Sequence, residues 1–85
     1  MKEKAFREYL AKTKHTEKSI ISRVSRLKKV EIYFELDIDS IIFNKTSVIQ
    51  LLNRIKAIDS QNQNLSNALR KYYTCMTNDE IGKIF

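Results

Sequence analysis

The scarcity of turn-forming residues is the feature that most limits this fold, because the 85-residue chain contains one glycine and no proline. Tight hairpin turns and sheet corners favour these residues, so the sequence argues against an all-β architecture and against a glycine-rich phosphate loop. The length allows a single domain over residues 1–85, and the hydrophobic share of 42% is ordinary for a globular protein. We therefore expect one small helical domain.

Apolar residues recur at helical spacing in four segments, which predicts four amphipathic helices. The segments are 3–13, 17–34, about 46–58 and about 62–77. Their predicted core-facing residues are Phe6, Leu10 and Thr13, flanked by Tyr9; Ile20, Val24, Leu27, Val30 and Phe34; Val48, Leu51, Leu52, Ile55 and Ile58; and Leu65, Ala68, Leu69, Tyr72 and Met76. Thr16 is placed to cap the second helix, and Thr46 or Asn44 to cap the third.

The remaining segments are short connections. Residues 35–45 begin with alternating apolar and acidic side chains, but a single strand has no partner here, so we interpret a connecting loop. Its apolar anchors are Leu36, Ile38 and either Ile41 or Ile42. The tail, 78–85, is compatible with a short fifth helix. The predicted fold is thus an all-α, compact, orthogonal four-helix bundle.

The positive charge is concentrated at one end of the sequence. Residues 1–30 hold ten Lys or Arg and three acids, a net charge of +7, whereas residues 31–85 carry −1. On the second helix, the cations and short hydroxyl residues lie opposite the apolar stripe; they are Lys18, Ser22, Ser25, Arg26 and Lys29. Cations and hydroxyls bind phosphates, which favours nucleic acid as the partner. A solvated helix face is the alternative for any single lysine.

Three motifs in order resemble the N-terminal core-binding domain of tyrosine recombinases, the SAM-like domain of phage-type integrases. The motifs are Phe6-x-x-Tyr9-Leu10, then Thr16-x-x-Ser19-Ile20-x-x-x-Val24-x-x-Leu27, then Leu65-x-x-Ala68-Leu69-Arg70-x-Tyr72-Tyr73. They span about residues 5–77, and they are degenerate and mostly hydrophobic. The resemblance implies a SAM-like bundle that forms half of a clamp around duplex DNA, with the second and fourth helices facing the DNA.

Carried over position by position, the resemblance implies a set of DNA-binding residues. The second helix offers Lys18, Ser19, Ser22, Arg23 and Arg26, with Lys29 on the same cationic face; the fourth helix offers Asn64, Asn67, Arg70 and Lys71. Lys14 and Thr16 in the preceding loop would contact the DNA backbone. The acidic stretch from Glu31 to Asp39 must then face away from the DNA. Asn and Arg on an exposed helix face are also suited to reading base edges.

Two functions stay open. The first is a duplex DNA-binding module of the core-binding type without a catalytic domain, either as a fragment of a longer recombinase or as a free-standing protein. The second is a protein-interaction module, such as a phage-encoded inhibitor or a regulatory subunit. It would use the basic face against an acidic protein surface, or the apolar tail residues Ile81, Ile84 and Phe85 as a docking element.

Residues that could carry chemistry are few, so we expect no enzyme, cofactor, metal site or small-molecule substrate. His15 fits a phosphate contact or a solvated turn, and the single Cys75 fits structural burial. Asp37 and Asp39 lack the glycine and distal Glu of a calcium loop. The four tyrosines all fit packing positions on helices. With no export signal and no apolar run of membrane-spanning length, we expect a cytoplasmic protein without a membrane partner.

Overall fold

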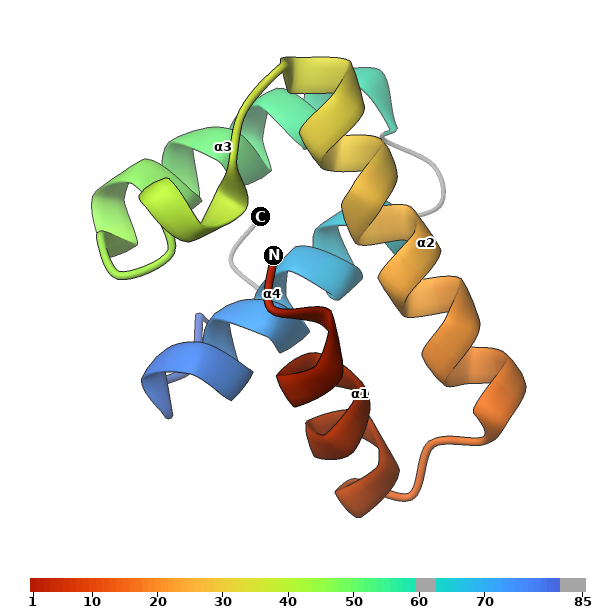
Figure 1. Ribbon diagram of the computed structural model, residues 1–85. Coiled ribbons are helices and arrows are strands. Elements are labelled where there is room, and N and C mark those ends of the chain that lie inside the picture. Colours follow the sequence, from red (N-terminus) through yellow and green to blue (C-terminus); the bar gives the residue numbers. More distant parts are fainter. Residues whose placement is uncertain (60–62, 82–85) are drawn as a thin grey trace.

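The computed structural model describes residues 1–59 and 63–81, and these ranges contain four α-helices and no strand (Figure 1). The helices are α1 (Glu3–Lys12), α2 (Glu17–Phe34), α3 (Lys45–Ile58) and α4 (Asn64–Thr77). A single 3-10 turn, η1 (Ile38–Ser40), interrupts the connection between α2 and α3. The predicted all-α, four-helix architecture is therefore confirmed.

Side chains that cap helix N-termini set two of the boundaries. The hydroxyl oxygen of Thr16 accepts a hydrogen bond from the Ser19 amide at 3.2 Å, and the side-chain oxygen of Asn44 accepts one from the Ser47 amide at 3.2 Å. Each bond satisfies an amide that has no carbonyl partner within its own helix. Thr16 is the predicted cap of α2, and Asn44 is the one of the two predicted candidates that caps α3.

In this glycine-poor chain, four residues other than glycine adopt the left-handed backbone conformation. Lys14 after α1, Glu35 at the end of α2, Gln63 before α4 and Asn78 after α4 have φ angles between 52° and 63°. For residues other than glycine this conformation costs roughly 1–2 kcal/mol, less for asparagine. Locally strained residues therefore lie at the end of α2 and at both ends of α4.

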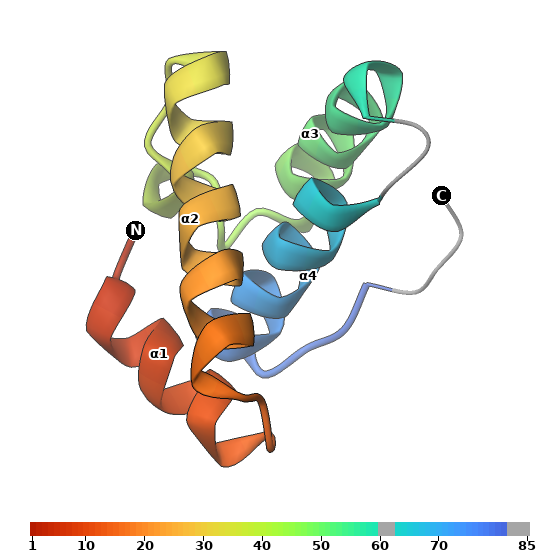
Figure 2. The same ribbon diagram turned by 90° about the vertical axis from the view of Figure 1, so that its right-hand side faces the viewer.

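Helix α4 lies at the centre of the fold, packing against α1, α2 and α3, and its contact with α2 is the most extensive (Figures 1 and 2). It contributes Ala68, Leu69, Tyr72 and Tyr73 to the core. The Phe6 ring of α1 meets the Tyr72 ring edge to face, with centroids 5.2 Å apart. The buried anchors of the α2–α3 connection, Ile38 and Ile42, belong to the predicted set.

Several sequence predictions at the edges of the core are wrong. Thr13 is exposed because its hydroxyl donates to the Leu10 carbonyl and closes the end of α1. Ile58 is 47% exposed at the last position of α3, and Tyr33 is 64% exposed on α2. Residues 79–81 are not helical, and the rest of the predicted fifth helix, like residue 62 of the fourth, lies outside the described residues.

Candidate nucleic-acid interface

A cleft of about 410 Å³ opens between α2 and α4. Its lining residues are Arg23 of α2; Asn67, Arg70, Lys71 and Thr74 of α4; and Glu80 and Ile81 from the segment that follows α4. Figure 2 shows α2 and α4 side by side. The two walls of the cleft thus come from helices that are far apart in the sequence.

The periodicity of α4 explains why its polar residues share one wall. Asn67, Arg70, Lys71 and Thr74 recur at intervals of three and four, which places them on one side of the helix, while Ala68, Leu69 and Tyr72 face the core. The Asn67 side-chain oxygen accepts a hydrogen bond from an Arg70 Nη2 group. The Thr74 hydroxyl donates to the Arg70 carbonyl at 3.1 Å. The contact with Asn67 holds the Arg70 guanidinium at the cleft, whereas the contact with Thr74 involves the Arg70 backbone.

The far edge of the cleft depends on how α4 ends. Asn78 adopts a left-handed conformation, and its amide donates to the Thr74 carbonyl at 2.8 Å. The chain then turns so that the Ile81 side chain packs into the core, where it is 7% exposed. Because Ile81 is anchored, Glu80 is held at the rim of the cleft.

The cleft is rich in positive charge that the fold does not neutralise. Within the described ranges, no ion pair involves Arg23, Arg70 or Lys71. Burial, together with the nearby positive charge of Arg26, lowers the pKa of the Arg23 guanidinium from its ordinary value. A partly buried cation that is repelled by a neighbour is stabilised by an arriving anion. The described lining of the cleft therefore carries more positive than negative charge.

The twelve sequence-predicted residues divide into two groups. Arg23, Asn67, Arg70 and Lys71 come together at the cleft, and Arg26 lies close enough to Arg23 to affect its pKa. The cleft lining does not include the other seven predicted residues, which are Lys14, Thr16, Lys18, Ser19, Ser22, Lys29 and Asn64. Lys14, Thr16, Lys18 and Lys29 are exposed, whereas Ser19, Ser22 and Asn64 are half-buried.

Sequence reasoning missed three residues of the cleft. Thr74 could have been included, because it follows Asn67 and Arg70 at helical spacing on the polar side of α4. No local signal marks Glu80 or Ile81, because their positions depend on the left-handed turn at Asn78 and on the packing of Ile81. The alternative function offers the apolar tail as one possible docking element, but Ile81 is part of the core, and Ile84 and Phe85 lie outside the described residues.

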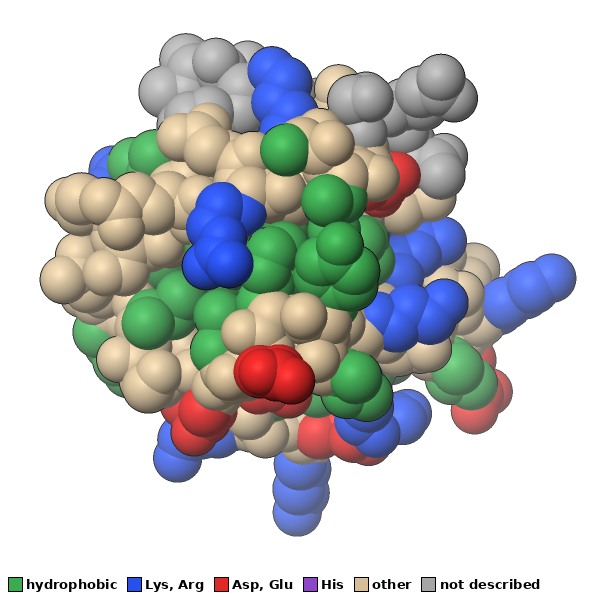
Figure 3. Space-filling model, turned by 90° about the horizontal axis from the view of Figure 1, so that it is seen from above, with side chains coloured by type: hydrophobic (Ala, Val, Ile, Leu, Met, Phe, Trp, Pro, Cys, Tyr) green, Lys and Arg blue, Asp and Glu red, His purple; other side chains and the backbone are tan. Residues whose placement is uncertain are grey.

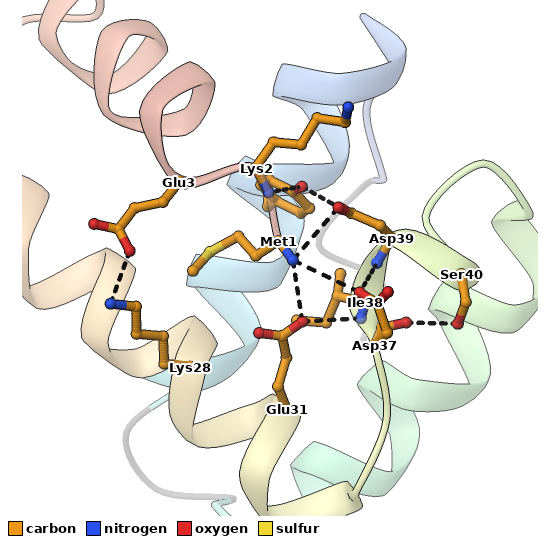
Figure 4. Close-up of polar contacts among 10 residues, drawn as sticks. Met1, Lys2, Glu3, Lys28, Glu31, Asp37, Ile38, Asp39 and Ser40 are labelled. Carbon is orange, nitrogen blue, oxygen red and sulfur yellow. Dashed lines mark hydrogen bonds and ion pairs between the residues drawn. The ribbon is translucent and has the colours of Figure 1, made fainter.

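The acidic segment from Glu31 to Asp39 is used to hold the N-terminus (Figure 4). The Met1 ammonium lies 3.3 Å from Glu31 Oε2, 3.4 Å from Asp39 Oδ2 and 3.6 Å from Asp37 Oδ1. The Tyr72 hydroxyl accepts from the Lys2 amide at 2.8 Å and donates to Asp39. The N-terminus and the segment after α4 lie on opposite sides of α2 in Figure 2. We call Met1, Glu31, Asp37, Asp39 and Tyr72 the N-terminal network.

Neither Cys75 nor His15 is among the described residues that line the cleft. Burial raises the pKa of the Cys75 thiol, whose sulfur lies 3.8 Å from the Ala5 carbonyl oxygen. The Nδ1 atom of His15 lies 2.8 Å from the Thr13 hydroxyl in the loop before α2. Over residues 1–59 and 63–81, no group of three or more His, Cys, Asp or Glu residues is arranged to hold a metal ion. Within the same ranges no helix has the length and apolar character needed to cross a bilayer.

The surface also exposes large apolar side chains outside the cleft. Ile32 and Tyr33 near the end of α2 are 76% and 64% exposed, and Phe43 before α3 is 69% exposed. Nearby, the Arg54 guanidinium lies 4.8 Å from the centre of the Phe34 ring. Figure 3 shows a face on which hydrophobic side chains gather around a basic one. These side chains are separate from the residues that line the cleft.

Comparisons of the chain with protein-family models, with curated proteins and with solved structures find no match.

Proposed function

We propose that this protein is a duplex DNA-binding module that presents α2 and α4 to the DNA. The observation that supports the proposal most is the cleft, which Arg23, Arg70 and Lys71 line together with a single described acid, Glu80, and where none of the three cations forms an ion pair within the described residues. Fully buried cations are usually paired inside the fold, whereas these three are half-buried and can reach an external anion. The exposed cations Lys14, Lys18 and Lys29 extend the positive charge along the loop and helix α2.

The proposal assigns different roles to the two helices. Lys and Arg on α2 neutralise phosphates and release condensed counterions, which supplies affinity for any sequence. The amide group of Asn64 on α4, which is not among the described residues that line the cleft, is suited to base edges, where it would supply sequence preference. The motif order that resembles a recombinase core-binding domain agrees with this division, and membership of that family stays a prediction.

Fluorescence anisotropy with a 20-base-pair duplex carrying 5′-hydroxyl ends tests the proposal. We expect a Kd on the order of 10 μM at low salt, with log Kd rising linearly with log salt concentration. Replacing Arg23 and Arg26 together by Ala should reduce that slope by about 0.9 for each phosphate that the variant no longer neutralises. Arg54→Ala is the charge-matched control, because its guanidinium lies over Phe34 and outside the cleft, and it should leave the slope unchanged.

Absence of binding below about 100 μM at low salt would rule out duplex DNA as the partner, because non-specific binders already bind in this range. The competing function is a protein-interaction module that applies the same cations to an acidic protein surface. A pull-down that recovers one stoichiometric protein after nuclease treatment, from a chain that fails the duplex titration, would support that function instead.

A further inference from the structure

The charge of the cleft can be compared with the charge of possible ligands. Three cations line it, Arg23, Arg70 and Lys71, and Glu80 is the one acid among its described lining residues. The described lining residues therefore carry a net charge of +2. A phosphodiester inside a DNA strand carries a single negative charge, whereas a phosphate monoester carries about −1.5 to −2 at pH 7. The cleft matches the monoester more closely.

The hydrogen-bonding groups of the cleft agree with this charge. The Asn67 side-chain oxygen is occupied by Arg70, so the Asn67 amide group keeps two N–H donors. The Thr74 hydroxyl proton is committed to the Arg70 carbonyl. Apart from Glu80, the lining thus offers mainly N–H donors. A phosphate monoester presents three strong acceptor oxygens, which is the complementary set.

The shape of the cleft also favours a phosphate at the end of a DNA strand over a phosphate within the strand. Its walls belong to two helices, and Glu80 and Ile81 line it from the segment after α4, so a phosphate that is attached on one side only fits most easily. Phosphates inside a duplex are flanked by sugars on both sides along a convex surface. A terminal phosphate is attached on one side only. A volume of about 410 Å³ also leaves room for hydration, because one water occupies about 30 Å³ of liquid.

We propose that the cleft between α2 and α4 binds a terminal phosphate monoester, presented by the 5′ end of a DNA strand. This inference rests on the proposed DNA binding, since the strand delivers the phosphate. Arg23 contacts the phosphate from α2, Arg70 and Lys71 contact it from α4, and Asn67 adds a neutral donor. Glu80 competes with the phosphate for the same cations and limits its affinity.

The experiment compares three probes on the full chain. They are a duplex with 5′-phosphate ends, the same duplex with 5′-hydroxyl ends, and inorganic phosphate alone, the first two followed by anisotropy and the third by calorimetry. We expect the phosphorylated duplex to bind about tenfold more tightly, as one charge-assisted interaction allows. Arg70→Ala and Lys71→Ala should each bring the ratio of the two Kd values close to one. Circular dichroism checks that both variants fold.

Two further variants distinguish binding in the cleft from the general attraction between a basic protein and DNA. Lys18→Ala is the control, because it removes an exposed cation of α2 outside the cleft lining. It should weaken both duplexes equally and keep the tenfold ratio. Glu80→Gln should increase the ratio several-fold, because it removes the competing carboxylate.

The outcomes distinguish this inference from the proposed function. Equal affinity for both duplexes overturns the terminal-phosphate site while leaving DNA binding in place. Binding of neither duplex overturns the proposed function and, with it, the strand end as the ligand. If inorganic phosphate binds in the cleft under those conditions, the source of the phosphate is a free anion, and the DNA-end assignment is wrong.

Discussion

The two sides of helix α2 differ in whether their charged side chains have partners within the fold. On the side of the N-terminal network, Glu31 accepts hydrogen bonds from the Met1 ammonium and from the Ile38 amide, at 3.3 and 3.1 Å. On the side of the cleft, Arg23 has no ion-pair partner among the residues that the structure describes. Charges that are satisfied inside the fold stabilise it, whereas charges left without a partner are available to a ligand. Variants on the two sides should therefore change different measured quantities.

The largest stability effect is expected in the N-terminal network. Tyr72→Phe removes the hydroxyl that joins the Lys2 amide to Asp39, so a donor and an acceptor lose their partner. We expect a loss of about 1–3 kcal/mol in the free energy of unfolding, measured by urea denaturation. Tyr73→Phe is the matched control on the same helix, because the Tyr73 hydroxyl is 3.4 Å from Asp79 and the loss should be under about 0.5 kcal/mol. Equal losses would contradict the structural role of the network.

The raised pKa of the Met1 ammonium makes the stability of the fold depend on pH. Burial by itself would lower the pKa of the Met1 ammonium, but the hydrogen bond to Glu31 and the charges of Glu31 and Asp39 raise it above 8.0. The folded state holds this proton more tightly, so the stabilisation is complete below pH 8 and is lost as pH rises through the folded-state pKa. The urea midpoint should fall above pH 8. Glu31→Gln should flatten that fall, and an unchanged slope would argue against the ion pairs.

Two residues that flank α2 share a left-handed backbone conformation but differ in charge, so their variants can be compared directly. Lys14 precedes the helix and Glu35 ends it, and both have left-handed backbones with φ angles of 63° and 52°. Replacing either by Gly should raise the unfolding free energy by about 1 kcal/mol, because glycine adopts this conformation without strain. Lys14→Gly should also weaken duplex binding, whereas Glu35→Gly should not. Thermal unfolding and anisotropy measure the two effects on the same samples.

The smallest stability effect is expected at the cleft. Arg23→Met keeps the apolar part of the side chain and removes a charge that Arg26 repels. The unfolding free energy should stay constant or rise by up to about 0.5 kcal/mol, while duplex binding weakens. A destabilisation of more than about 1 kcal/mol would show that Arg23 has a structural partner, and the contrast between the two sides of α2 would then fail.

The sequence is informative wherever structure is set by neighbouring residues. The stripe of Val24, Leu27 and Val30 and the cap at Thr16 predict the bounds of α2, because helical periodicity and capping act within a few positions. The N-terminal network has no such local signal, since its bonds join α4 to the chain's first residues and to the segment after α2. The position of Glu80 cannot be predicted from the sequence for a similar reason, because it depends on the packing of Ile81 in the core.

Because the walls of the cleft come from two different helices, ligand binding is coupled to folding. Because Arg23 and Arg70 meet only when α2 and α4 pack together, the cleft exists only in the folded chain. A ligand that occupies it must shift the folding equilibrium, by about 2.7 kcal/mol at a free concentration one hundred times its Kd. In a domain of this size each kcal/mol raises Tm by roughly 4–8 °C. Heating the protein with candidate phosphates would therefore rank them by affinity without any label or immobilised partner.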